Sequence, residues 1–254
     1  MVEVVFTNAY SYAPIKDMTK VDMHCHTNIS DGMNNPKEVI KMAKKLKIGI
    51  SITDHNAIEA SLMACRELPF AIPGVEITSS DAIDFLAYFY DTGSMEEFYN
   101  KHIKGHHLST RVFNLRKLKW SSEELLSDLK KHNCLVVLPH PMTVRPKNSF
   151  TFMNNHPKLL RYIHGIEVIN SIMSQEANEN AVLWAKELDK GVTGASDAHD
   201  IAYLGKALTA SHAENVEEFL DNIAKKKNIV VGTNISGFSK LHHSLKILSR
   251  NLSW

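Results

Sequence analysis

The stretch from residue 21 to residue 55, VDMHCHTNISDGMNNPKEVIKMAKKLKIGISITDH, indicates how this chain folds. Val21–His24 predicts a short strand, and Ile48–Thr53 predicts a second one. Between them Asn35-Pro36 opens a helix, because proline is tolerated in the first helical turn, where its missing N–H is not needed. Apolar residues then recur at helical spacing, at Val39, Ala43 and Leu46. The stretch is therefore predicted to be one strand–helix–strand unit.

The same alternation continues along most of the chain. Further strands are predicted at Phe70–Thr78, Ile83–Tyr90, Leu135–Leu138, Gly165–Ile169, Val192–Ala195, Lys206–Ala210 and Ile229–Val231. Further helices are predicted at Glu123–His132, at Val216–Lys226 and around Ala177, Ala181, Trp184 and Leu188. Short strands separated by helices predict an α/β fold with a mainly parallel sheet. With about seven such units the pattern favours a TIM-like barrel over an open sheet, and residues 1–254 are predicted to form a single domain.

Two segments interrupt this alternation. Residues 95–119 are polar and basic, and they are predicted to be an inserted helical pair. Residues 237–254, with Leu241, Leu245 and Leu248, are predicted to form a C-terminal amphipathic helix packed on the outside.

The composition excludes several classes of protein. With 44% hydrophobic and 22% charged residues over 254 positions, the chain has the make-up of a globular domain rather than a disordered one. The formal charge of +1 gives no overall electrostatic reason to expect nucleic acid or an anionic membrane as partner. Because no run of about 18 apolar residues occurs, we expect no membrane span.

The cysteines suggest a compartment. Cys25, Cys65 and Cys134 are odd in number and widely spaced, and the chain has no CxxC pair, so no disulfide framework is expected. Met1–Asp17 lacks a basic start followed by an apolar core, which a signal peptide would have. A reduced, cytoplasmic setting is therefore predicted.

Histidines and carboxylates recur where the predicted strands end. Alternate residues of a strand point to the same side, so a pair such as His24 and His26 can converge on one cation. Any one of these motifs has an ordinary structural explanation, such as a surface pair or a buried ion pair. Together they supply imidazole and carboxylate from five strands at the edge where barrel enzymes assemble their sites. The candidate ligands are His24, His26, Asp31, His55, Glu76, His140, Asp197 and His199.

The order of these motifs resembles that of the PHP (polymerase and histidinol phosphatase) superfamily. The motifs are His24-x-His26, Ser30-Asp31-Gly32, Thr53-Asp54-His55, Gly74-Val75-Glu76, Pro139-His140-Pro141 and Ser196-Asp197-Ala198-His199, and the likeness runs from about Val21 to Leu208. The resemblance implies a distorted (β/α)7 barrel with two or three divalent metal ions at its mouth. The imidazole and carboxylate ligands suit Zn, Mn, Fe or Mg.

The resemblance also implies how the ligands are grouped. His24, His26, Glu76 and Asp197 would surround one metal, and Glu76 would bridge to a second held by His140. Asp31, His55 and His199 would hold the third. Many members complete the second site with a His or Cys after the strand that corresponds to Gly165–Ile169. Here that place offers Asn170, a weaker ligand.

The leading functional hypothesis is a phosphatase or phosphodiesterase acting on a small phosphorylated metabolite or nucleotide, by attack of metal-activated hydroxide on phosphorus. Asp197 and His199 are candidates to move the proton, and Arg145 and Lys206 are candidates to bind the phosphate. A nuclease that trims oligonucleotide ends is an alternative, because Arg111, Arg116, Lys117 and Lys119 form a basic stretch, although a solvated surface explains these residues more simply. A non-catalytic metal-binding module and metal-dependent C–N hydrolysis are further alternatives. The sequence leaves the oligomeric state open.

Overall fold

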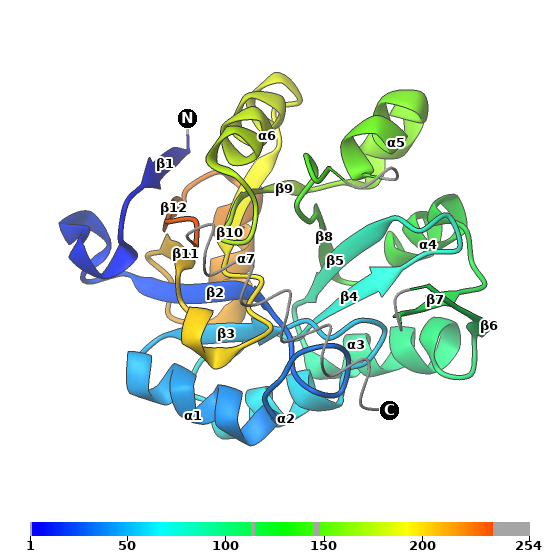
Figure 1. Cartoon of the computed structure of the whole chain (residues 1–254), viewed down its shortest axis with the longest axis horizontal. Helices are drawn as coiled ribbons and strands as arrows, with labels where there is room; N and C mark the ends of the chain where they lie inside the picture. Colours follow the sequence, from blue (N-terminus) through cyan, green and yellow to red (C-terminus); the bar gives the residue numbers. More distant parts are fainter. Residues whose placement is uncertain (1, 113–114, 145–147, 236–254) are drawn as a thin grey trace.

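Two five-stranded sheets form the centre of the molecule (Figure 1). The computed structural model describes residues 2–112, 115–144 and 148–235. The first sheet has the order β1 (Glu3–Phe6), β12 (Ile229–Gly232), β11 (Ala207–Ser211), β2 (Thr19–Cys25) and β3 (Gly49–Ile52). The second has the order β10 (Gly191–Ala195), β9 (Gly165–Asn170), β8 (Cys134–Leu138), β5 (Asp84–Phe89) and β4 (Gly74–Thr78).

The α/β fold is confirmed, whereas the predicted closed barrel is not. Within the described residues no continuous ladder joins the two sheets; isolated parallel bridges link Cys25 to Ala198, Ile50 to Ala71 and His55 to Glu76, and β10 packs beside β2. The strands are also less parallel than predicted, because β5 is antiparallel to β4 and β8, and β11 is antiparallel to β2 and β12. A turn of five residues joins β4 to β5, and a connection that short permits only an antiparallel pair.

The helices cover the outer faces of the sheets. They are α1 (Pro36–Leu46), α2 (Glu59–Glu67), α3 (Thr92–Phe98), α4 (Ser122–Leu129), α5 (Ser149–Asn155), α6 (Gln175–Glu187) and α7 (Val216–Ala224). Among them, α1 and α2 lie against β3, α6 against β9, and α7 against β10. The helix starts follow from local chemistry, because Asn35 with Glu38 and Ser121 with Glu124 form complete capping boxes. The short helices α2 and α5 and the strand β1 were not predicted from the sequence.

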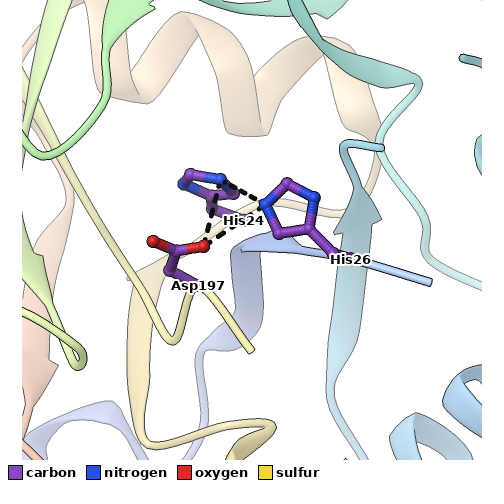
Figure 2. A group of neighbouring side chains, drawn as sticks. All are labelled: His24, His26 and Asp197. Carbon is purple, nitrogen blue, oxygen red and sulfur yellow. Dashed lines mark hydrogen bonds and ion pairs between the residues drawn. The ribbon is translucent and has the colours of Figure 1, made fainter. Parts of the chain in front are cut away.

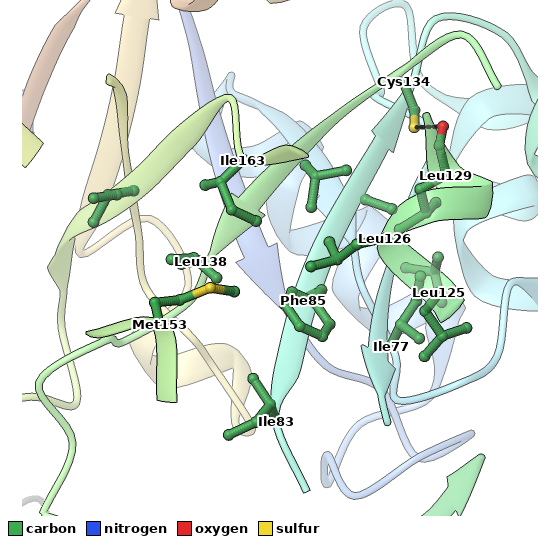
Figure 3. Close-up of a cluster of buried hydrophobic side chains, with 14 of the residues drawn as sticks. Ile77, Ile83, Phe85, Leu125, Leu126, Leu129, Cys134, Leu138, Met153 and Ile163 are labelled. Carbon is green, nitrogen blue, oxygen red and sulfur yellow. Dashed lines mark hydrogen bonds between the residues drawn. The ribbon is translucent and has the colours of Figure 1, made fainter. Parts of the chain in front are cut away.

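The largest apolar cluster fixes α4 against the second sheet (Figure 3). Leu125, Leu126 and Leu129 of α4 are fully buried and belong to the same apolar cluster as Phe85 of β5. Burying a leucine or phenylalanine side chain contributes about 1.5–3 kcal/mol, so α4 is held firmly. The Sγ atom of Cys134, at the start of β8, donates to the carbonyl oxygen of Leu129.

The predicted helical pair over residues 95–119 is wrong in its second half. After α3 and a π-helical turn, η3 (Tyr99–Ile103), the chain forms a hairpin of β6 (His107–Val112) and β7 (Leu115–Leu118). Gly105 has a φ of +76°, which ends the helical run, and the buried Leu118 then fixes β7 on the core. The predicted helix over residues 237–254 lies outside the described residues.

Among the helices of the described residues, none combines the length and the apolar character needed to cross a bilayer.

Candidate metal centre

The ends of β2 and β10 lie side by side and bring the first three candidate ligands together. The backbone N–H of Asp197 donates to the carbonyl oxygen of His24 at 2.8 Å, and that of His26 donates to Ala198 at 2.9 Å. Figure 2 shows the two imidazoles and the Asp197 carboxylate pointing toward one another. The Nε2 atoms of His24 and His26 are 3.0 Å apart, and Asp197 Oδ1 is 3.5 and 3.3 Å from them. Asp197 has a φ of 51°, an uncommon conformation that aims its carboxylate inward.

Glu76 is the central carboxylate of the cluster. It is 0% exposed, in the middle of β4. Its Oε2 atom lies 3.2–3.3 Å from the Nε2 atoms of His24, His26 and His55. Its Oε1 atom lies 3.4 Å from Nε2 of His140. One side chain therefore contacts four imidazoles, so Glu76 could be shared between two metal ions if the cluster holds them.

A third group is formed by Asp31, His55 and His199. Oδ2 of Asp31 is 3.1 Å from Nε2 of His199 and 3.9 Å from Nε2 of His55, and its Oδ1 is 3.6 Å from Nδ1 of His26. The eight imidazole and carboxylate residues predicted from strand ends thus form one connected cluster of close contacts.

The group around His140 contains a carboxylate that the sequence argument missed. Asp84, the first residue of β5, has an oxygen within 4.8 Å of the ligand atoms of Glu76 and His140. Asp84 is directly opposite Thr78 in the β4–β5 ladder, so its place beside Glu76 depends on the hairpin register. A carboxylate at the head of an otherwise apolar strand was the available signal.

Asn170 contacts Glu167 and Asp197, but its amide oxygen points toward the backbone. Oδ1 accepts from the backbone N–H of Ile172 at 3.0 Å. Its Nδ2 donates to Glu167 at 2.9 Å and to Asp197 Oδ2 at 3.1 Å. In this orientation Asn170 is better suited to position the two carboxylates than to act as the predicted metal ligand.

Glu167, also in β9, orients two of the ligands. Its Oε1 accepts from His24 Nδ1 at 3.0 Å, and its Oε2 accepts from the backbone N–H of His140 at 2.8 Å. When Nδ1 of His24 carries the proton, Nε2 presents its lone pair to the cluster, as in carboxylate–histidine–metal arrangements.

Replacing Glu167 with alanine is expected to weaken metal binding by the centre about 10–100-fold, because the His24 ring loses the acceptor that fixes its orientation. Competition with a chromophoric chelator measures the change. Glu167→Gln keeps one acceptor oxygen and is expected to lie between the two. An alanine variant that binds metal within about twofold of the wild type would show that Glu167 does not orient the ligands.

Asp54 holds the loop that carries His26 and Asp31. Its two oxygens accept from the N–H and hydroxyl of Thr27, at 2.7 and 2.6 Å, and from the Ser30 hydroxyl at 2.6 Å. Asp54 therefore stabilises the conformation of this loop.

The glycine of Ser30-Asp31-Gly32 packs against the same loop. A Cβ atom at Gly32 would lie 2.6 Å from the carbonyl oxygen of His26 and 2.9 Å from the carbonyl carbon of Thr27. Gly32→Ala is therefore expected to lower the free energy of unfolding in urea by about 1–3 kcal/mol, because the backbone atoms that the new Cβ would contact cannot move without distorting the loop. At Gly93, in α3, a Cβ would approach only the Asp91 side chain, so Gly93→Ala is the matched control, expected to be neutral or slightly stabilising. An equal effect of both substitutions would contradict this account of Gly32.

The electrostatics of the cluster favour a bound cation. Burial raises the pKa of Glu76, but His55 and His24 outweigh it and hold the pKa well below its usual range. Burial lowers the pKa of His199, and Asp31 and Asp197 reverse this and bring it to about 9. Within the described residues Glu76 Oε1 is buried without a hydrogen-bond partner. Acceptor atoms of His24, His26, Glu76 and Asp197 converge where a divalent cation would satisfy them together, so the donor set fits metal ions.

The two predicted phosphate-binding residues are not tied to this cluster by the described contacts. Arg145 lies outside the described residues. Lys206 is exposed, and its backbone N–H donates to Tyr203. Both assignments stay predictions.

Comparison with known proteins identifies a family model and a relative. Residues 175–228 match the family model described as PHP-associated. The chain is 30% identical over 203 residues to the uncharacterized protein MJ0417 of Methanocaldococcus jannaschii. The aligned region covers 78% of this chain and 73% of that protein.

Solved structures share the fold. A candidate metal-dependent phosphoesterase from Bifidobacterium adolescentis superimposes with a TM-score of 0.56 at 18% identity, covering 86% of this chain and 98% of that one. Endonuclease Q from Pyrococcus furiosus gives a TM-score of 0.60 at 15% identity, covering 84% of this chain and 57% of that one. At these identities the likeness establishes the fold alone.

Proposed function

Because this chain belongs to the PHP superfamily of metal-dependent phosphoesterases, we propose that it hydrolyses a phosphate monoester or diester of a small metabolite or nucleotide at the cluster centred on Glu76. The observation that carries the proposal is the position of Glu76, buried and within 3.4 Å of four imidazoles. Burying a carboxylate costs free energy unless positive charge compensates it, and bound metal ions would supply that charge here.

Three groups of side chains would hold two or three divalent metal ions, drawn from Zn, Mn, Fe or Mg. The groups are His24, His26, Glu76 and Asp197; Glu76, His140 and Asp84; and Asp31, His55 and His199. Asp84 replaces Asn170 in this assignment because it supplies a carboxylate oxygen, whereas the Asn170 oxygen is already hydrogen-bonded. When bound, such cations supply an activated water and neutralise the charge of the phosphate oxygens.

The chain's own groups would manage the proton. His199 has Nδ1 3.6 Å from Asp197 Oδ1 and Nε2 3.1 Å from Asp31, and its side chain remains 12% exposed. As a partly exposed imidazole beside two carboxylates, it would hold a proton for the leaving oxygen while it is not bound to a metal ion. Asp197 would orient it, and Arg145 and Lys206 would bind the phosphate.

A substrate panel tests the proposal. Purified protein with added Mn²⁺ or Zn²⁺ is expected to release inorganic phosphate or an alcohol from at least one phosphate ester, and a chelator is expected to stop the release. His26→Ala should abolish it, because His26 contributes to the first group and borders the third. Unchanged activity of His26→Ala would show that the reaction occurs elsewhere.

A nuclease acting on oligonucleotide ends is the second candidate. It is supported by the shared fold with endonuclease Q, which has been solved in complex with a 27-mer duplex carrying an abasic lesion at the active site. The basic residues of the β6–β7 region supply the charge that a phosphate backbone requires. An end-labelled oligonucleotide separates the candidates, since a metabolite phosphatase leaves internal phosphodiesters intact.

Absence of metal and of activity after reconstitution would favour a non-catalytic module. A cytoplasmic location stays a prediction.

A further inference from the structure

A second cluster of metal-binding residue types lies apart from Glu76. His102 comes from η3, Asp128 from the last turn of α4, and His132 from just after α4. Their ligand atoms all lie within 4.8 Å of one another. His132 precedes β8 by two residues and His140 follows β8 by two, so the two clusters lie at opposite ends of one strand. A five-residue strand spans roughly 15 Å, so they share no ligand.

The fold holds these three residues in place. The leucines of α4 anchor the helix in the core (Figure 3), which leaves Asp128 and His132, four residues apart, on neighbouring turns. His102 is 8% exposed and stacks on Phe98 with the ring centroids 4.9 Å apart. The π-helical turn brings His102 to this position, and single π-turns occur often at functional sites.

The polar contacts of the cluster centre on the carboxylate of Asp128. Nε2 of the buried His102 forms an ion pair with Oδ2 of Asp128. The other oxygen, Oδ1, accepts from Lys131 Nζ at 2.6 Å. Lys101 Nζ lies 3.3 Å from Oδ2. Asp128 thus has one oxygen committed to Lys131 and one directed at His102.

We propose that His102, Asp128 and His132 bind one zinc-class divalent cation, in a site separate from the phosphoesterase centre and here called the peripheral site. Two imidazoles and a carboxylate, with a water as fourth ligand, form a common zinc coordination set. A cavity of about 620 Å³, lined by His102, Trp120, Asp128 and Lys131 among others, gives water access to it. Lys131 would support the ligating carboxylate by its hydrogen bond to Oδ1.

Lys101 is the group that competes with a cation for Oδ2. Its side chain is 57% exposed, so it can turn into solvent when the cation binds. The affinity of the peripheral site is therefore set partly by this lysine. A purely structural ion pair between His102 and Asp128 is the alternative, and it predicts no metal at all.

Metal counting tests the peripheral site. Chelated full-length protein is equilibrated with buffered micromolar Zn²⁺, freed of unbound metal and analysed by atomic emission. His132→Ala, which alters a half-buried position, is expected to carry one equivalent of zinc fewer than the wild type and to keep its phosphoesterase activity. His212→Ala, at an exposed histidine outside both clusters, is expected to match the wild type. Equal zinc content of the wild type and His132→Ala would overturn the proposal.

Removing the competing lysine gives an independent test. The difference in visible Co²⁺ absorption between the chain and its His132→Ala variant isolates the peripheral site. Lys101→Ala is expected to shift the midpoint of that difference to a cobalt concentration about fivefold lower, the scale of one exposed ion pair. A midpoint that stays in place or moves higher would contradict the assignment of Oδ2 as a ligand.

Discussion

Replacing Glu76 with glutamine is expected to lower the rate of phosphate ester hydrolysis by about a thousandfold or more. Both oxygens of Glu76 lie within 3.4 Å of imidazole nitrogens, and the substitution keeps its size while removing the charge that would join two cations. Loss of a single preorganised electrostatic contact costs about 10²–10³ in rate, and Glu76 would be shared by two of the proposed metal groups. Steady-state kinetics with saturating Mn²⁺ measures the effect.

The control for this variant is Glu187→Gln, at an exposed position of α6. It removes the same charge far from the cluster and is expected to leave the rate unchanged. Circular dichroism should show the same fold for both variants. A Glu76→Gln rate within about tenfold of the wild type would mean that Glu76 bridges no catalytic cations.

Replacing Asp22 with alanine is expected to cause the largest loss of stability, about 4 kcal/mol at pH 5. Asp22 is fully buried in β2 and accepts from Ser196 N–H at 2.9 Å, the Ser196 hydroxyl at 2.6 Å and Gly205 N–H at 2.8 Å. Alanine leaves three buried donors without an acceptor, and each costs about 1–3 kcal/mol. The segment that precedes Asp197 then loses its anchor to β2.

The effect of this variant should depend on pH in a defined direction. Burial raises the pKa of Asp22 from 3.8 to about 6, against the hydrogen bonds from Ser196 and Gly205. A raised carboxyl pKa contributes stability that is complete below the unfolded pKa and is lost as the pH rises through the folded pKa. The difference between wild type and Asp22→Ala is therefore expected to be about 1 kcal/mol smaller at pH 7 than at pH 5.

Urea unfolding at the two pH values measures both quantities. Asp22→Asn keeps one acceptor oxygen and cannot titrate, so it should be intermediate at pH 5. A difference between wild type and Asp22→Ala below about 1 kcal/mol at both pH values would contradict the anchoring role.

The sequence predicted well which imidazoles and carboxylates come together, because their positions depend on local pattern; their role as metal ligands stays a prediction. His24, His26 and Asp197 lie at the ends of short runs, five to seven residues long, whose length and flanking residues favour strands over helices. The order of the motifs then predicted which ligands would meet. The bridge between Cys25 and Ala198 places the His24-x-His26 motif beside the motif that contains Asp197.

What the sequence did not predict depends on contacts between distant segments. The antiparallel pairing of β5 with β4 and β8, and the division into two sheets, are not encoded by residue periodicity. Asp84 enters the cluster only through the register of that hairpin. The role of Asn170 depends on whether its amide nitrogen or its amide oxygen faces the Glu167 carboxylate. The composition of β9 does not determine this orientation.

Activity as a function of added metal tests the central claim most directly. Protein stripped by a chelator is titrated with Mn²⁺ while hydrolysis of a chromogenic phosphate ester is followed. The account predicts no activity at the start and a rise that saturates at two to three equivalents per chain, with Glu76→Gln remaining inactive throughout. Full activity of the stripped protein, or equal rescue of Glu76→Gln, would contradict it.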